Sequence, residues 1–389
     1  MEKRIYLDNA ATTRVDERVL DAMMPFLREN YGSASSLFYE EGMQAGTALE
    51  QARVDVARIL GVDKEEIIFT SGGTEAANLA ILGTAESSKG KEIITTRIEH
   101  PAVLDTCESL EKGGYKVHYL EVDRDGFVNP SDIEKAMSEN TALVTIGHAN
   151  IEIGTIQPVE EIGEICRKHK VLFHVHASQT IGHVKFLIPE LNADLVSFSA
   201  HRFYGPKGVG ALYVKNGTKL SPVLHGGGHE HGLRSGTENI AGIVGLAKAL
   251  EIAYENLDEE AKRVAALRGR LVDEILKIDN TWLNGPKEKR LPGNANFGFK
   301  YIEGEAIILS LNMKNVAAST GSACSSKNLK ASHVLLGIGQ KQEYTHGSVR
   351  FSIGRYNTEE DIDHAITALK EVVEALREMS PYGKGGEDY

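Results

Sequence analysis

The sequence predicts an α/β fold with a seven-stranded, mostly parallel sheet, helices on both faces of the sheet, and a smaller C-terminal α+β domain. Two patterns support this prediction. Short runs rich in β-branched and aromatic residues alternate with helical segments through the first two-thirds of the chain, and after about Gly245 long amphipathic segments predominate. The predicted strands are residues 66–70, 92–95, 117–120, 142–146, 171–175, 195–198 and 210–214.

The C-terminal part is expected to combine long helices with a few strands. A helix is predicted over residues 258–278, strands over 294–299 and 306–311, and a last helix from the polar cap at Asn357-Thr358 to about Met379. We therefore expect a large α/β domain over residues 1–255 and a small α+β domain over residues 256–389. About the first 15 residues are expected to pack with the small domain.

Composition excludes several classes of protein. The 389 residues are 41% hydrophobic and 25% charged, and no apolar run approaches the ~18 residues of a membrane span. Lys and Arg number 43 against 55 Asp and Glu, a net charge of −12, which argues against general binding to nucleic acid or anionic membranes. Three cysteines are too few for a disulfide framework. The first residues lack the apolar stretch of a secretory signal, so we expect a cytoplasmic protein.

A turn of small residues follows the first long strand. Ser71-Gly72-Gly73-Thr74-Glu75 leads directly into a helical run. Backbone N–H groups at such a helix N-terminus suit a phosphate, although a tight turn with a threonine cap explains the pattern equally simply.

Polar side chains gather at the ends of four further strands. Because the carboxyl ends of parallel strands meet at one rim of a sheet, we expect these residues to surround a ligand crevice. They are His100, Ile151, His176, Gln179, Ser199, His201 and Arg202. A minor alternative is a metal site built on the imidazoles of His100, His176 and His201.

The cysteines divide into two kinds. Cys324 is surrounded by small residues in Ala318–Ser326, so we expect an accessible thiol that acts as a nucleophile, sulfur carrier or metal ligand. Cys107 and Cys166 lie on helical apolar stripes and are expected to pack in the core.

The whole chain resembles the NifS/IscS-type cysteine desulfurases, which are pyridoxal-phosphate (PLP) enzymes of aminotransferase class V with fold type I. The resemblance rests on YLDNAATT, SGGTEAANLAI, EHPAVL, HANIEIGTIQP, SFSAH, GPKGVGALYV, RSGTEN, STGSACSS and RFSIGRYNTEED, in family order. It implies a homodimer, PLP on the large-domain sheet, L-cysteine as substrate and sulfurtransferase activity. It also implies a role in iron–sulfur cluster assembly or tRNA thiolation, with a scaffold protein as partner.

The resemblance also implies individual roles. Four residues would bind the cofactor phosphate: Thr74, Ser199, His201 and, reaching from the partner subunit, Thr237. His100 would stack on the pyridine ring and Gln179 would contact its phenolic oxygen. Arg350 would clamp the substrate carboxylate, a task that suits a guanidinium. Cys324 would form the persulfide.

Several positions depart from the family pattern. Arg202 stands where the family has the Schiff-base lysine, and a guanidinium cannot form that bond. His176 replaces the aspartate of HVDAAQ that keeps the pyridine nitrogen protonated, and Ile151 replaces the second asparagine of HANNEIG. GNPSSLH and GGGQERG are also altered, at Ser33, Ala34, Phe38, His229 and His231.

These departures predict that PLP chemistry is impaired. The favoured hypothesis is a cysteine desulfurase-family protein of iron–sulfur assembly, in which Cys324 carries sulfur as a persulfide or ligates iron in a [2Fe-2S] cluster shared with a scaffold. The alternative is an active PLP-dependent L-cysteine desulfurase that gives L-alanine and an enzyme persulfide. Whether the chain is an enzyme therefore depends on Arg202.

Overall fold

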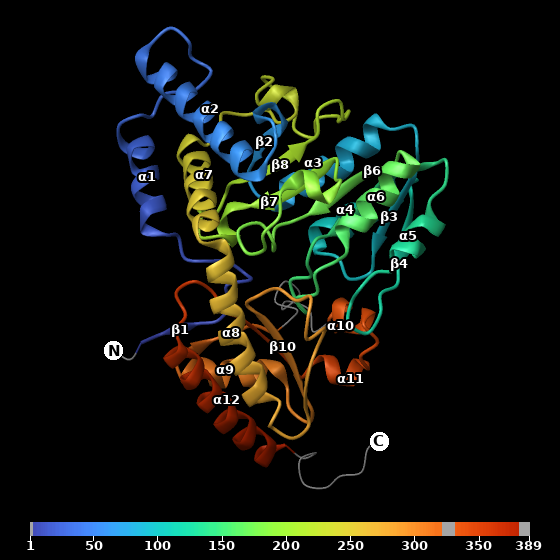
Figure 1. Ribbon diagram of the computed structural model, residues 1–389, viewed down its shortest axis with the longest axis vertical. Coiled ribbons are helices and arrows are strands. Elements are labelled where there is room, and N and C mark those ends of the chain that lie inside the picture. Colours follow the sequence, from blue (N-terminus) through green and yellow to red (C-terminus); the bar gives the residue numbers. More distant parts are fainter. Residues whose placement is uncertain (1–2, 321–330, 381–389) are drawn as a thin grey trace.

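A seven-stranded sheet forms the upper part of the computed structural model, which describes residues 3–320 and 331–380 (Figure 1). Its strand order is β2-β8-β7-β6-β5-β3-β4. The strands are β2 (Ile67–Thr70), β3 (Glu92–Thr96), β4 (Lys116–Leu120), β5 (Thr141–Gly147), β6 (Leu172–His176), β7 (Leu195–Ser199) and β8 (Gly210–Val214). Only β8 runs antiparallel to its neighbours in this sheet. The predicted seven strands and their mostly parallel arrangement are confirmed.

Helices cover both faces of this sheet, because successive side chains of a strand point to opposite faces. In β2, Ile67 and Phe69 join a hydrophobic cluster with one set of helices, whereas Ile68 joins a second cluster with the other set. The first set contains α2 (Glu40–Leu60), α6 (Val159–His169) and α7 (Ile240–Glu255), and the second α3 (Gly73–Ser87) and α4 (Pro101–Lys112). Helices α1 (Glu17–Arg28) and α5 (Pro130–Ala136) complete this part. Doubly covered strands explain the near-continuous apolar runs in the sequence.

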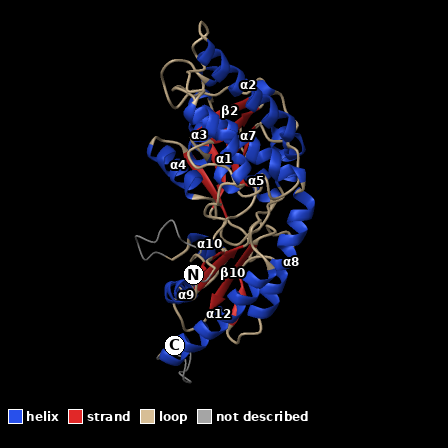
Figure 2. Cartoon of the chain, turned by 90° about the vertical axis from the view of Figure 1, so that its left-hand side faces the viewer, coloured by secondary structure: helices blue, strands red, loops and turns tan. Residues whose placement is uncertain are grey.

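A separate antiparallel sheet forms the lower part of the molecule, with strand order β12-β10-β9 (Figures 1 and 2). Its strands are β9 (Thr281–Leu283), β10 (Asn294–Phe299) and β12 (Ser348–Ser352). The accompanying helices are α8 (Leu257–Ile275), α9 (Gly304–Met313), α10 (His333–Gly337), α11 (Gln342–Thr345) and α12 (Glu359–Met379). A separate hydrophobic cluster joins strands β10 and β12 to helices α8, α9 and α12. The domain boundary at residue 255 stays a prediction.

The N-terminal segment lies beside the C-terminal sheet. Strand β1 (Ile5–Tyr6) pairs in parallel with β11 (Val316–Ala317), and Leu7 N–H donates to the carbonyl of Ala317 at 2.9 Å. This pairing brings the loop after β1 to the junction of the two sheets.

One predicted strand is wrong. Residues 306–311 belong to helix α9, not to a strand. The run of Ile and Leu there fits either element, since a short apolar run has no decisive period. In the helix, Ile307 and Leu311 are buried four residues apart, while Leu309 is exposed. The last helix is as predicted: the Thr358 hydroxyl accepts the N–H of Asp361 at 3.3 Å.

Cys107 and Cys166 are buried in helices α4 and α6, which confirms that they pack in the core. Burial raises the pKa of both thiols to about 12. Cys324 lies outside the described residues. Within the described ranges, the helices are too short or too polar to cross a membrane.

Candidate active site

A cavity that opens to solvent lies at the carboxyl ends of β5, β6 and β7. Its position follows from the topology, because the last residue of each of these strands, Gly147, His176 and Ser199, lines it. The cavity brings together seven of the predicted site residues: Thr74, His100, His176, Gln179, Ser199, His201 and Arg202. Ile151 also lines it. Their individual roles stay predictions.

One end of the cavity is shaped by the start of α3. A Cβ placed on Gly73 would lie 2.6 Å from Ser178 Oγ and 3.4 Å from Ser199 Cβ, so a larger residue there would displace the Ser178 hydroxyl. Ser178 is 5% exposed, and its hydroxyl has no hydrogen-bond partner among the described residues. A helix N-terminus and an unpaired buried hydroxyl lining the same cavity suit an oxyanion such as a phosphate.

Imidazoles also line the cavity, and that of His176 lies next to the start of α3. The rings of His100 and His176 lie 5.5 Å apart between centroids, tilted by 31°. His100 Nδ1 accepts the N–H of Ala102 at 3.1 Å and so caps α4. Burial, with a smaller contribution from the charge of Arg202, lowers the pKa of His100 to about 4. Burial likewise holds the pKa of His176 well below its usual range. Both rings are therefore neutral at pH 7.

Arg202 supplies the positive charge in this region. Its Nη1 donates to the carbonyl oxygen of Ala11 at 2.6 Å, and its own carbonyl accepts from His183 Nε2 at 2.7 Å. Burial and then the charge of Arg202 lower the pKa of His201 to about 4. His201 Nδ1 also lies 3.1 Å from Thr12 Oγ1. The guanidinium thus ties the cavity to the N-terminal loop.

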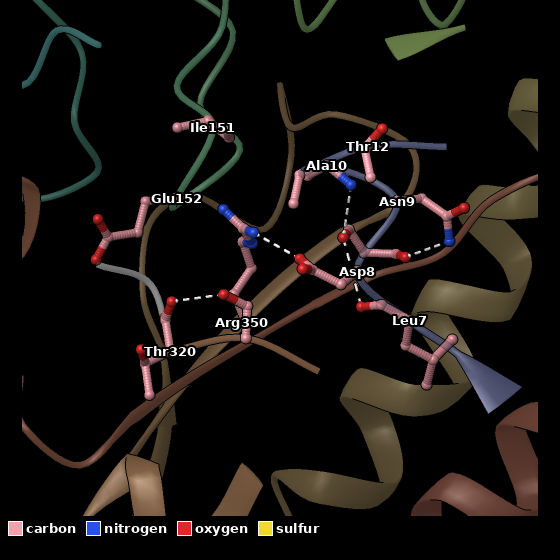
Figure 3. A network of polar contacts seen from close by, with 12 residues as sticks. Leu7, Asp8, Asn9, Ala10, Thr12, Ile151, Glu152, Thr320 and Arg350 are labelled. Carbon is pink, nitrogen blue, oxygen red and sulfur yellow. Dashed lines mark hydrogen bonds and ion pairs between the residues drawn. The ribbon is translucent and has the colours of Figure 1, made fainter. Parts of the chain in front are cut away.

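Arg350 stands on β12 in the lower sheet and does not line the cavity. Its Nη2 donates to Asp8 Oδ1 at 2.7 Å, and Figure 3 shows the guanidinium directed toward that carboxylate. The Arg350 side chain is 3% exposed. Its Nε has no hydrogen-bond partner within the described part of the chain. The guanidinium therefore keeps donor capacity for a second carboxylate.

Some predicted residues do not join the cavity. Thr237 is exposed on the segment before α7 and does not line the cavity of its own chain. The residues that the structure describes include no group of three or more His, Cys, Asp or Glu placed to hold a metal ion. The metal site expected from His100, His176 and His201 is therefore not formed.

Three residues that bear on the site were not anticipated. Ser178 could have been noticed, because HVHASQ has a serine where the family's HVDAAQ has an alanine. Glu99 lines the cavity, and burial raises the pKa of its carboxyl to about 7. Asp8 lies within the motif YLDNAATT, but its ion pair with Arg350 joins residues too distant in sequence for a local signal.

Known proteins resemble this chain over nearly its full length. The aminotransferase class V family model matches residues 5–365. "Cysteine desulfurase IscS" of Dictyoglomus turgidum is 49% identical over 98% of both chains, and that of Methanosarcina thermophila is 50% identical over 97% of this chain and 94% of the relative. A solved structure described as a NifS-like protein has 42% identity and a TM-score of 0.91, covering 96% of this chain and all of that one. The chain therefore belongs to the cysteine desulfurase group of the aminotransferase class V family.

Proposed function

We propose that this protein is a cysteine desulfurase-family component of iron–sulfur cluster assembly in which covalent PLP chemistry is impaired. Cys324 would carry sulfur as a persulfide or ligate iron in a [2Fe-2S] cluster shared with a scaffold protein. The observation that carries the proposal is the guanidinium of Arg202 at the cavity, in the family position of the amine that holds PLP.

The cavity residues suit the phosphate of PLP but not the covalent attachment of its ring. The start of α3, the unpaired Ser178 hydroxyl and Ser199 form a phosphate cradle of backbone N–H and hydroxyl groups, the chemistry that binds a phosphate. When bound covalently, PLP supplies an electron sink for bond cleavage next to the substrate amine. Arg202 stays protonated and cannot form the covalent link. The neutral His176 cannot provide the anion that holds a pyridine nitrogen in its protonated form.

Arg350 supports a substrate or product with a carboxylate. Its buried guanidinium is held by Asp8 through one nitrogen, while Nε has no partner among the described residues. An amino-acid carboxylate such as that of L-cysteine would bind Nε and compete with Asp8. The proposed role of Arg350 is therefore to bind the carboxylate of the family substrate.

A homodimer is part of the proposal. Large apolar side chains are exposed along α1, α2 and their connection: Leu27, Tyr31, Leu37, Phe38 and Met43. Phe38 is 98% exposed, and such a concentration of apolar surface is typical of a subunit interface. Thr237, exposed on its own chain, would reach the phosphate of the partner's cavity.

The second candidate function is an active L-cysteine desulfurase. It is favoured by the retained phosphate cradle and by relatives near 50% identity. The two candidates differ in what brings sulfur to Cys324: in the second, L-cysteine is consumed and L-alanine is released.

Anaerobic reconstitution with a purified scaffold protein tests the proposal. The protein, its Cys324→Ser variant and a Ser325→Ala control are each incubated with scaffold, iron and sulfide, and the cluster spectrum is recorded. We expect cluster yield or spectrum to change with Cys324→Ser and not with Ser325→Ala. Equal spectra for all three would contradict the iron-ligating role of Cys324. Release of one alanine per cysteine by the unmodified protein would favour the active enzyme.

A further inference from the structure

A chain of hydrogen bonds leads from the sheet interior to the cavity. Thr145 Oγ1 lies 2.8 Å from His174 Nδ1, His174 Nε2 lies 2.9 Å from Ser197 Oγ, and Ser197 Oγ lies 2.8 Å from His176 Nδ1. The four residues stand on the adjacent strands β5, β6 and β7. Thr145, His174 and Ser197 are fully buried, and His176 is 7% exposed. We call these residues the relay.

The relay has two self-consistent proton arrangements. Each neutral imidazole carries one N–H, and the Ser197 hydroxyl has one proton to donate. Ser197 must therefore donate to one ring and accept from the other. Burial lowers the pKa of His174 to about 3 and holds that of His176 well below its usual range, so both rings are neutral at pH 7.

Thr145 decides between the two arrangements. Within the described residues its buried hydroxyl has no other side-chain or backbone partner than His174 Nδ1. Thr145 therefore donates to His174 Nδ1, His174 Nε2–H donates to Ser197, and Ser197 donates to His176 Nδ1. The reverse arrangement leaves the threonine proton without an acceptor, and a buried unsatisfied donor disfavours it by roughly tenfold or more.

The favoured arrangement places the remaining proton of His176 on Nε2. That atom makes no hydrogen bond to any described residue, and His176 lines the cavity. His176 Cε1, which is bonded to Nε2, lies 3.6 Å from the Cβ position at Gly73, so the ring stands beside the phosphate cradle.

We propose that His176 is a specificity-determining residue, held by the relay as an Nε2–H donor toward the cavity. It would select a phosphorylated heteroaromatic ring, bound without a covalent link, whose ring nitrogen is unprotonated and accepts the hydrogen bond. An aspartate in the same position would select a ligand whose ring nitrogen is protonated. The preference that we propose for His176 is the reverse of that one. The ligand class rests on the proposed function, through the phosphate cradle and Arg202, whereas the protonation of His176 rests on the relay alone.

The relay is tested by nitrogen NMR on the ligand-free full-length protein labelled with 15N-histidine. Long-range proton–nitrogen spectra distinguish a protonated from an unprotonated imidazole nitrogen, and a His176→Asn variant assigns the signals. We expect His176 protonated at Nε2 in the parent protein and in Thr145→Ser, and a mixture of both tautomers in Thr145→Val. A parent protein protonated at Nδ1, or a Thr145→Val spectrum identical to the parent's, would overturn the relay.

The selection is tested by equilibrium binding of PLP and of its ring-N-methylated analogue, which cannot accept a hydrogen bond. We expect PLP to bind roughly tenfold or more tightly than the analogue, and the His176→Asp variant to prefer the methylated cation. Equal affinities, a preference for the analogue, or no binding of either compound would overturn the selection. Neither the NMR spectra nor the binding affinities involve Cys324, whose role is measured by cluster yield. A negative result for His176 can therefore be distinguished from a negative result for the proposed function.

Discussion

The Arg202 guanidinium donates to the carbonyl oxygen of Ala11 across 2.6 Å and thereby connects the cavity to the loop after β1. The same loop carries Asp8, which pairs with Arg350 on β12. Two arginines, one at the cavity and one on the lower sheet, thus contact a single N-terminal segment. Backbone hydrogen bonds to both parts of the molecule, such as those of Asn9 N–H to Ser352 and Thr13 N–H to His201, also hold this segment.

Removing the charge of Asp8 should destabilise the protein. It should also increase the rise in melting temperature that an added amino acid causes. Asp8→Asn leaves the buried Arg350 without its anion, and we expect a loss of about 3 kcal/mol in the free energy of unfolding. An added carboxylate ligand such as L-alanine should then raise the melting temperature more in the variant than in the parent protein. An equal or smaller shift in the variant would show that Asp8 does not compete for Arg350.

A second buried ion pair fixes the loop around Glu230. Arg53 forms two hydrogen bonds to the Glu230 carboxylate, at 2.7 and 2.9 Å, and both side chains are almost fully buried. Glu230→Gln should cost about 3–5 kcal/mol in denaturant unfolding, because it leaves the buried Arg53 cation with only the exposed carboxylate of Glu50 as its anion.

The matched control is Glu50→Gln, which removes a 51% exposed partner of the same arginine. We expect it to cost less than about 1 kcal/mol. Similar losses for the two variants would contradict the difference in burial.

Glu99 should make stability depend on pH. Burial raises the pKa of its carboxyl from 4.5 to about 7, so the folded protein binds a proton that the unfolded chain has released. Its contribution to stability is therefore favourable below pH 4.5 and is lost as the pH rises toward 7, by up to about 3 kcal/mol.

Glu99→Gln removes this titration. The difference in unfolding free energy between the variant and the parent should be constant below pH 4.5 and should shift in favour of the variant between pH 4.5 and 7. A difference that stays constant across this range would mean that Glu99 titrates normally in the folded protein.

Ser178 should contribute to phosphate binding. Ser178→Ala removes a buried hydroxyl without a partner among the described residues, and we expect PLP to bind roughly 3- to 10-fold more weakly, as measured by equilibrium dialysis. Thr84 offers a matched control, since its hydroxyl is also buried and lacks a partner in the described part of the chain, but it does not line the cavity. Thr84→Val should leave PLP affinity unchanged. A loss of affinity in both variants would point to a general effect on α3.

The sequence predicted the strands well because the apolar runs, apart from that of the edge strand β4, are buried on both faces of the sheet. The residues around the cavity were predicted for the same reason, since strand ends such as His176 and Ser199 meet at one rim. The relay could not be predicted, because it depends on the register that sets His176 opposite Ser197 in β6 and β7. Helix α9 was missed because the burial of Ile307 and Leu311 is a tertiary property.

The pairing of Asp8 with Arg350 likewise lay beyond sequence reasoning. The two residues are separated by 342 positions and meet only because β1 joins β11 beside the lower sheet. Ser178 and Glu99 lie in the motifs HVHASQ and EHPAVL, but an unpaired hydroxyl or a raised pKa depends on the surrounding atoms of the folded protein.

The role that we propose for Arg202 and His176 is to prevent covalent PLP chemistry. It is tested most directly by mass spectrometry after incubation with PLP and reduction with borohydride, alongside an assay for alanine released from L-cysteine. The parent protein should gain no PLP mass and release no alanine, and the Arg202→Lys/His176→Asp variant should do both. Covalent PLP and alanine release by the parent protein would contradict the claim.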